Sequence, residues 1–321
     1  MSFARGLLFA ALCACSLAQA QTPFPSKPIR LIVTSPAGGS NDILNRIVGA
    51  KLAELLAQPV LIDNRPGASG FVAAEMVAKA PADGYTLLGA TEATLVANPL
   101  FFKKVPYDPQ RDFAPVTIAV EIGYVLLVHP SVPANSVPEL IALARSKPGA
   151  LNYASSGNGS AFHIGMELFK RMAGVDIVHV PFKGSALSVN AMLAGDVQIM
   201  LNGTPNGVPL ARSGKLRALA VAGARRSPLA PELPTIAESG LPGYDMSGWF
   251  GTVAPAGTPA AVVASLNREY VRALRSPEVR ERLEGYGFEV VGNTPEEFAS
   301  RMRNESQRLA RVIQESGAKP E

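Results

Sequence analysis

Two short turns in the sequence combine glycine, serine and a following helix in a way that suits the binding of an anion. One turn runs from Pro36 to Asp42 and the other from Ser155 to His163, and each follows a run that predicts a strand. The first residues of a helix carry unsatisfied backbone N–H groups and the positive end of the helix dipole, so they bind an anion without a cationic side chain. Glycine lets the backbone approach a ligand closely, and Ser40 and Ser160 add hydroxyl groups.

Each turn by itself is equally typical of an ordinary helix cap, with Ser40 or Asn41 capping the first helix. Two similar turns in two halves of one chain favour a shared anion site between two α/β domains. His163 falls one helical turn after Ser160, so it either points at the same ligand or lies on the helix surface.

The usual motifs of catalysis are missing from the sequence. It contains no G-x-S-x-G elbow and no phosphate-binding P-loop, and Phe162 stands where a dinucleotide fingerprint starting at Gly157 needs glycine or alanine. The three histidines have no second histidine or carboxylate at metal-ligand spacing, so we expect no metal and no cofactor. A nucleophilic pair of Ser160 and His163 would have no orienting acid, and we expect no enzyme activity.

The N-terminal residues 1–20 have the features of a secretory signal peptide. Arg5 precedes an apolar run over 6–17, which ends in Ala18-Gln19-Ala20, and we expect cleavage after Ala20 and a periplasmic location. Lipid attachment at Cys15 is an alternative, although Cys13 departs from the usual acceptor pattern. Both cysteines lie inside this segment, so the mature chain would contain no disulfide.

Length and charge restrict the number of domains and the kinds of partner that we expect for the mature chain. About 300 residues follow the leader, and a chain with 47% hydrophobic residues at this length predicts two domains. No later run is apolar for long enough to span a membrane. The formal net charge is only +4, and the basic residues are spread along the chain, so we expect no nucleic-acid partner.

Strand-like and helix-like segments alternate along the chain, which predicts an α/β fold with parallel βαβ units. The predicted strands are 29–33, 60–62, 86–89, 124–128, 151–154, 177–180, 197–201 and 216–222. The predicted helices begin after Ser40, at 73–80, at Ser136 with Glu139 three residues on, and after Ser160, and three more cover 260–274, 277–286 and 295–316.

Over essentially its whole mature length the sequence resembles the substrate-binding proteins of tripartite tricarboxylate transporters, the Bug family. The motifs that carry the resemblance include Pro36-Ala37-Gly38-Gly39 with Asp42, Asn64-Arg65-Pro66-Gly67, Pro81-Ala82-Asp83-Gly84-Tyr85, Gly157-Asn158-Gly159-Ser160 and Pro255-Ala256-Gly257-Thr258-Pro259. Each motif is modest alone, but their number and order make the resemblance specific.

The resemblance implies a two-lobed periplasmic binding protein of type II-like fold, with the ligand in the cleft between two α/β lobes. The first lobe would comprise residues 21–124 and 251–321, and the second 125–250, with crossings near Gly123–Val125 and Trp249–Thr252. The resemblance further implies a monomer that captures a mono- or dicarboxylate by lobe closure and delivers it to membrane permease subunits. A ligand sensor for a membrane signalling protein, or an enzyme using Ser160 and His163, are the alternatives.

The resemblance and the two turns together give a set of predicted ligand-binding residues. They are Ala37, Gly38, Gly39, Ser40, Asp42, Thr91, Glu92, Ser156, Asn158, Gly159, Ser160, His163, Phe182, Asn202 and Thr204.

Two of these residues depart from the family pattern. Glu92 stands where relatives have small or hydroxyl residues, and it either contacts the ligand or points to solvent. Asn202 replaces an Asp that many relatives carry for a ligand amine. Phe182 and Trp249 could face a larger acid, but hinge or core packing is the expectation for Trp249.

Overall fold

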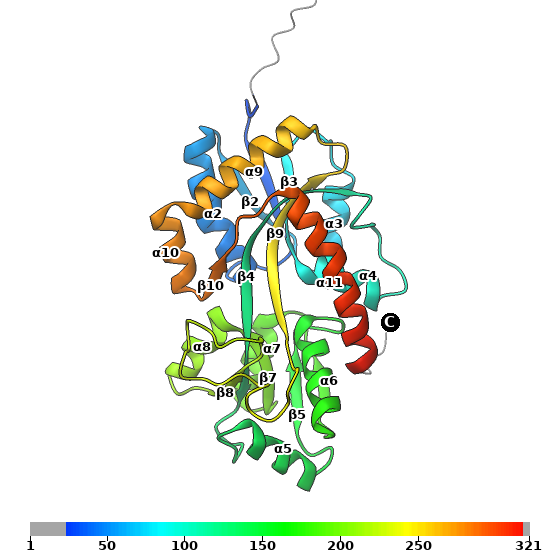
Figure 1. Ribbon diagram of the computed structural model, residues 1–321, viewed down its shortest axis with the longest axis vertical. Coiled ribbons are helices and arrows are strands. Elements are labelled where there is room, and N and C mark those ends of the chain that lie inside the picture. Colours follow the sequence, from blue (N-terminus) through cyan, green and yellow to red (C-terminus); the bar gives the residue numbers. More distant parts are fainter. Residues whose placement is uncertain (1–23, 317–321) are drawn as a thin grey trace, which may run out of the picture.

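The computed structural model describes residues 24–316 and shows two α/β halves, one above the other, joined by long strands (Figure 1). Ten strands form one continuous sheet that runs through both halves, with the order β2-β1-β3-β9-β4-β7-β5-β6, and β8 and β10 both pair with β4. The predicted signal peptide, its cleavage site and the cysteines lie outside the described residues. Within the described part, no helix is long and apolar enough to cross a membrane.

Three parallel strands form the centre of the first half. They are β1 (Ile29–Val33), β2 (Val60–Asn64) and β3 (Thr86–Thr91). β1 lies between β2 and β3, with Ile29 opposite Val60 and Leu31 opposite Leu87. The apolar runs of β1 and β3 are buried, whereas β2 is half-buried with Leu61 exposed, and the carboxyl ends of all three strands point towards the second half.

Two antiparallel strands connect the halves, namely β4 (Phe113–Val128) and β9 (Ser247–Pro255). β4 pairs with β9 up to Gly123 and with β7 from Tyr124 onwards, so its partner changes where the sequence predicted a crossing. Two predictions were wrong here, because β4 begins at Phe113 rather than Tyr124 and β9 was not predicted as a strand. Pro115, Gly123 and two register shifts interrupt the strand pattern of β4.

The second half repeats the parallel arrangement around β5. Its strands are β5 (Asn152–Ser155), β6 (Val178–Pro181), β7 (Ile199–Gly203) and β8 (Arg217–Val221). β5 is parallel to both β6 and β7, as alternating strands and helices predict, whereas β7 and β8 run antiparallel to β4. Its helices are α5 (Val137–Ser146), α6 (Ala161–Ala173), α7 (Ser185–Ala194) and α8 (Thr204–Arg212).

The helices of the first half come from both ends of the chain. They are α2 (Ser40–Leu56), η2 (Ala68–Gly70), α3 (Phe71–Ala78), η3 (Ala93–Ala97), α4 (Asn98–Phe101), α9 (Ala260–Arg275), α10 (Pro277–Gly285) and α11 (Pro295–Ser316); the short strand β10 (Phe288–Val290) pairs with β4. α11 packs along β4 and η3 and continues down to α6, so the C-terminal helix touches both halves (Figure 1).

A hydrophobic core extends across the junction of the two halves. Trp249 is buried and meets the edge of Phe298 at a centroid distance of 5.1 Å, so the prediction of core packing for Trp249 is confirmed. Ile164, Leu168 and Phe169 are buried on one face of α6 as predicted, but Met172 is exposed. The two-lobed fold class is confirmed, and the residue boundaries of the lobes stay predictions.

Candidate functional site

The first predicted turn, between β1 and α2, presents its backbone towards the second half. Gly38 has φ +80°, and the Gly39 N–H donates to the Pro36 carbonyl at 3.1 Å. The helix cap is Gly39, and Ser40 is already the first helical residue, so the prediction that Ser40 or Asn41 caps the helix was wrong. Because Ser40 does not cap, its hydroxyl is available for contacts across the junction.

Asp42 holds this turn together from inside α2. Its buried carboxylate accepts hydrogen bonds from the Gly38 N–H at 2.8 Å, from Arg46 Nε at 2.9 Å and from Asn64 Nδ2 at 2.8 Å. Burial acts to raise the pKa of Asp42, but these hydrogen bonds outweigh it and hold the pKa below the usual 3.8. Asp42 therefore supports the Gly38 turn, and Asn64 at the end of β2 holds the carboxylate of Asp42 in place by a hydrogen bond.

The second predicted turn, between β5 and α6, is held by short side chains and two glycines. Gly157 has φ +130° and Gly159 has φ +70°, conformations that favour glycine. Ser155 Oγ donates to the Gly157 carbonyl at 3.1 Å and accepts from the Gly157 N–H at 3.2 Å. Ser160 is the cap of α6, and its hydroxyl accepts from the His163 backbone N–H at 3.2 Å.

His163 supports this turn in the way that Asp42 supports the first. Only 8% of the residue is exposed, and its Nδ1 accepts a hydrogen bond from the Gly159 N–H at 3.1 Å. A ring nitrogen that accepts from a backbone N–H carries no proton of its own, which fixes the tautomer. The expectation of a surface histidine was wrong, because the imidazole is buried between His179 and the edge of Phe101.

Both turns lie where the two halves of the molecule meet. A Cβ built on Gly159 would come within 2.6 Å of Phe101 Cδ1, which belongs to α4 of the first half. On the other side, Ser40 Oγ accepts a hydrogen bond from Asn206 Nδ2 of α8 at 3.2 Å. The amino ends of α2, α6 and α8 thus face one junction, and backbone N–H groups from both halves converge there.

A third strand-to-helix turn, Asn202-Gly203-Thr204 between β7 and α8, completes this arrangement. Asn202 is 1% exposed and its Oδ1 accepts from the Gly203 N–H at 2.8 Å, while Thr204 is fully buried. Asn206 and Phe101 were not predicted from the sequence as residues of this junction. Pro205 at the first turn of α8 is a helix-start signal that could have drawn attention to Asn206.

Comparison with known proteins gives this junction a context. Residues 44–318 match the family model described as the tripartite tricarboxylate transporter family receptor, TctC. The chain belongs to this family. It is 37% identical to protein BugT of Bordetella pertussis, over 92% of this chain and 91% of BugT.

Two solved structures share both the fold and a substantial part of the sequence. R. palustris Rpa4515 with adipate has a TM-score of 0.90 and 39% identity, covering 93% of this chain and all of that one. MatC from Rhodopseudomonas palustris with bound malate has a TM-score of 0.85 and 35% identity, covering 90% of this chain and all of that one. These similarities confirm the predicted family and the periplasmic binding-protein fold.

Glu92 of this receptor has a position that neither interpretation of the sequence anticipated. It is 5% exposed, so the prediction that it points to solvent was wrong. Its carboxyl group faces Arg308 of the C-terminal helix, with Glu92 Oε1 3.7 Å from Arg308 Nη2. The preceding residue, Thr91, ends β3 and its hydroxyl lies 3.0 Å from the hydroxyl of Thr94.

The remaining predicted residues surround the β5–α6 turn or the tip of the first turn. Phe182 donates its backbone N–H to Ser155 at 3.1 Å, and its side chain packs against the apolar cluster around Met200. Ser156 accepts from the Gly184 N–H through its carbonyl at 3.2 Å. Ala37 is exposed at the tip of the first turn, and Asn158 is half-buried between the two glycines of the second turn.

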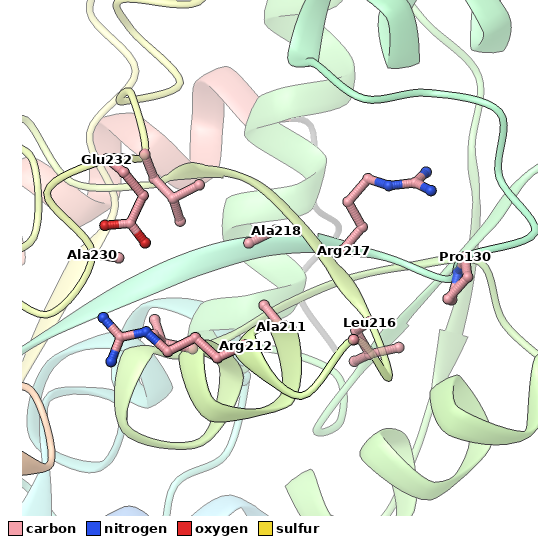
Figure 2. A pocket seen from close by; sticks show the side chains of 11 residues that line it. Pro130, Ala211, Arg212, Leu216, Arg217, Ala218, Ala230 and Glu232 are labelled. Carbon is pink, nitrogen blue, oxygen red and sulfur yellow. The ribbon is translucent and has the colours of Figure 1, made fainter.

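One hollow of the receptor lies away from these turns (Figure 2). It has a volume of about 490 Å³ and opens between the end of α8, β8 and the loop at Ala230. The two arginines at its border, Arg212 and Arg217, donate to backbone carbonyls of Leu229 and of Val132 and Ala134. The donors of these arginines are thus already used within the protein, whereas the turns at the junction present backbone N–H groups at helix starts.

The geometry also bears on the alternative of a serine nucleophile. The Ser160 hydroxyl is bonded to the backbone N–H of His163, while the ring Nδ1 of His163 accepts from Gly159. The pair is thus arranged as a helix cap and a turn support. The family and its solved relatives are solute-binding proteins, which agrees with this arrangement.

Proposed function

We propose that this protein is an extracytoplasmic receptor that captures a small organic carboxylate between its two halves and delivers it to a tripartite tricarboxylate-type membrane transporter. The observation that carries the proposal is the convergence of two glycine-containing turns at the junction. Each turn begins a helix, and each is supported from behind by one buried side chain, Asp42 or His163.

The physical basis is recognition of negative charge by backbone dipoles. The amino ends of α2 and α6 offer N–H groups at positive helix ends, which stabilise a carboxylate without a counter-ion. Hydroxyl groups of Ser40, Thr91 and Ser160 lie in or beside the same turns. When the halves enclose the ligand and water is excluded, charge-assisted hydrogen bonds of this kind become stronger.

The ligand class follows from the relatives together with these donors. Rpa4515 was solved with adipate and MatC with malate, both small organic acids. At 39% and 35% identity over nine-tenths of the chain, these relatives support a small carboxylate as the ligand here. The proposed chemistry is binding alone, with no bond made or broken in the ligand.

Calorimetric titration with adipate and malate tests the binding step. We expect saturable binding of at least one acid, and a loss of about tenfold or more in affinity for Gly159→Ala. Its Cβ would collide with Phe101 and would force the turn out of shape. Gly174→Ala is the matched control, because Gly174 ends the same helix with φ +61° but has nothing within 4 Å of a Cβ.

The control should bind as tightly as the unaltered protein, since both replacements carry a similar backbone cost of about 1–2 kcal/mol, but the Cβ at Gly174 meets no neighbour and lies at the far end of the helix. If neither acid binds, or if both variants bind alike, a carboxylate site at this junction is wrong.

Delivery, location and oligomeric state need separate measurements. Uptake of adipate into vesicles that contain transporter subunits of the tripartite tricarboxylate type should require the added receptor. Uptake that does not depend on the receptor would exclude delivery and favour a sensor. Fractionation should find the mature protein in the periplasm, and sedimentation should give the mass of a monomer.

A further inference from the structure

A cluster of charged side chains, two of them buried carboxyl groups and the others partly exposed, lies where the C-terminal helix crosses the junction of the two halves. Glu92 comes from the end of β3, Glu121 from β4, and Arg301, Glu305 and Arg308 from α11. Glu92 and Glu305 are 5% and 7% exposed. The carboxylate-binding turns contain none of these five residues, so the proposed ligand site does not account for the cluster.

The two guanidinium groups in this cluster are already used by other acids. Glu305 is 2.7 Å from Arg308 Nε and 3.0 Å from Arg301 Nε, and Glu121 is 3.2 Å from Arg301 Nη2. Arg308 also donates to the carbonyl of Asp245 at 3.4 Å. Three carboxyl groups therefore face two guanidinium groups, and ionisation of all three would leave one negative charge without a partner.

Of the three carboxyl groups, Glu92 is the one with no guanidinium group within hydrogen-bonding distance. Among the residues that the structure describes, its Oε1 has no hydrogen-bond partner, and Arg308 at 3.7 Å is beyond hydrogen-bonding distance. Two titratable groups besides the arginines face Glu92: the carboxyl group of Glu305, which shares a side-chain hydrogen bond with it, and the hydroxyl of Tyr124 on β4. A Cβ on Gly248 would lie 3.2 Å from Glu92 Oε2. A buried carboxylate with such surroundings is costly, whereas the neutral acid is not.

The location connects this carboxyl group with movement of the two halves. Tyr124 and Gly248 lie on β4 and β9, the strands that pass between the halves. Tyr124 also meets the edge of Phe162 on α6 at 5.2 Å, and Asp245 belongs to the second half. Charge at Glu92 thus acts next to residues of both connecting strands and of α11, close to the contact between Tyr124 and α6.

We propose that Glu92 is a proton-operated latch: its neutral form keeps α11 packed across the junction, and its ionisation loosens that packing and favours separation of the halves. The consequence for ligand release rests on the proposed function, because separation of the halves would lower the affinity for the carboxylate. The loosening itself belongs to the ligand-free protein.

The electrostatics of the site agree with this geometry. Burial, followed by the negative charge of Glu305, raises the pKa of Glu92 to about 8, and the two arginines offset this only in part. The folded protein then holds a proton that the unfolded chain has lost between about pH 4.5 and 8. The free energy of unfolding should therefore fall as the pH rises through this window. The packing of α11 should loosen near pH 8, where Glu92 ionises in the folded protein.

The single tryptophan of the chain offers a direct measurement. Trp249 follows Gly248 on β9 and is 1% exposed, so its emission reports hydration of the connecting strands. In the ligand-free protein we expect a sigmoidal change of Trp249 emission between about pH 6.5 and 9.5. Glu92→Gln should abolish the transition, because glutamine keeps the shape and cannot ionise.

Two further variants make the test specific. Glu305→Gln removes the neighbouring negative charge and should move the transition to lower pH, since the pKa of Glu92 then falls back towards its ordinary value. Glu315→Gln, an exposed position on the same helix, should leave the transition unchanged. A transition that persists unaltered in Glu92→Gln, or one that is absent from the unaltered protein, would overturn the latch.

Titration with adipate at about pH 6.5 and 9 extends the test to binding. A weaker affinity at the higher pH in the unaltered protein but not in Glu92→Gln supports control of release by the latch. Equal pH dependence in both proteins overturns that control. Absence of adipate and malate binding at either pH, with the emission transition intact, counts against the proposed function and leaves the latch standing.

Discussion

The imidazole rings of His163 and His179 lie face to face, with their centroids 4.2 Å apart and their planes inclined by 8°. Tyr153 stacks on the other face of His179 at 4.7 Å, and His179 Nε2 lies 2.7 Å from Ser155 Oγ. The stack thus joins the strand residue that starts the β5–α6 turn to the helix residue that supports it. The two rings cannot both be protonated in this arrangement, because two stacked imidazolium ions would repel each other.

The stack makes the stability of the second half sensitive to acid. Burial, and then the neighbouring His163, lower the pKa of His179 from 6.5 to about 4. Between these values the unfolded chain binds a proton that the folded protein does not, so the free energy of unfolding should fall as the pH drops from about 6.5 to 4.

Urea unfolding at several pH values measures this effect. The unfolding equilibrium constant should rise by up to about tenfold per pH unit inside the window, and His179→Gln should show a flatter dependence. His129→Gln is the control, since the His129 ring bonds to Ser131 two residues away and lies outside the stack, so this variant should keep the slope of the unaltered protein. Identical slopes in all three proteins would contradict a depressed pKa for His179.

Asp42 provides a second prediction, about the support of the first turn. Asp42→Asn replaces one of the two accepting carboxylate oxygens by an NH₂ group, which can only donate. This NH₂ group then faces either the donors of Gly38 and Arg46 or the donor of Asn64, and those hydrogen bonds are lost. Loss of charge-assisted hydrogen bonds at a buried site should lower the free energy of unfolding by about 2–3 kcal/mol. Carboxylate affinity should fall as well, because the Gly38 turn is no longer held.

Glu54→Gln on the same helix removes an exposed ion pair with Lys51 and should cost less than about 0.5 kcal/mol. Chemical unfolding and calorimetric titration of both variants give the two quantities. Tight carboxylate binding by Asp42→Asn together with reduced stability would show that Asp42 contributes to folding but not to ligand binding.

The sequence predicted those parts of the fold that depend on neighbours along the chain. Ser136 caps α5 by accepting from the Glu139 N–H, and Glu139 accepts from Asn135, as the spacing indicated. The three central strands of each half were found for the same reason, since each is a compact apolar run. β9 was missed because its glycines and polar residues form no apolar run, and its strand pairs with β4 and β3, which lie far from it in the sequence.

For the candidate site, too, the sequence predicted the features that depend on neighbouring residues and missed those that depend on distant ones. Glycine and serine at two helix starts identified both turns, but the supports behind them were predicted as ligand contacts, because a spacing cannot show whether a side chain faces the ligand or its own loop. The environment of Glu92 could not be predicted at all. Its neighbours Glu305 and Arg308 come from the far end of the chain, more than 200 residues away, and lie beside it only in the folded protein.

A third prediction concerns Gly207 in the interior of α8. Replacing a helical glycine by alanine ordinarily raises stability by about 0.5–1 kcal/mol. At Gly207 a Cβ would collide with Val125 and lie 3.2 Å from Leu127 Cδ1, both fully buried on β4. We therefore expect Gly207→Ala to lower the free energy of unfolding by about 1–3 kcal/mol, the reverse of the usual sign.

Gly285→Ala at the end of α10 is the comparison, because a Cβ there meets nothing within 4 Å. It should leave the melting temperature unchanged or raise it slightly, while Gly207→Ala lowers it. Equal shifts for the two variants would mean that α8 does not pack on β4 as closely as described.

The hydrogen bond between Ser40 and Asn206 joins α2 to α8 and therefore joins the two halves. Ser40 also lies in the turn proposed to bind the carboxylate, so Ser40→Ala alone would mix a lost ligand contact with a lost contact between the halves. A double-mutant cycle with Asn206→Ala separates the two, because the coupling term retains only what the two side chains do together.

For adipate affinity we expect a coupling of about 0.5–1.5 kcal/mol, the range of a single hydrogen bond. For unfolding of the ligand-free protein we expect less coupling, because halves that separate without ligand also break this bond before unfolding begins. Strictly additive losses of affinity would show that the bond plays no part in enclosing the ligand. Equal coupling in affinity and in ligand-free stability would show instead that the halves stay together without ligand, and that the ligand enters a site already formed.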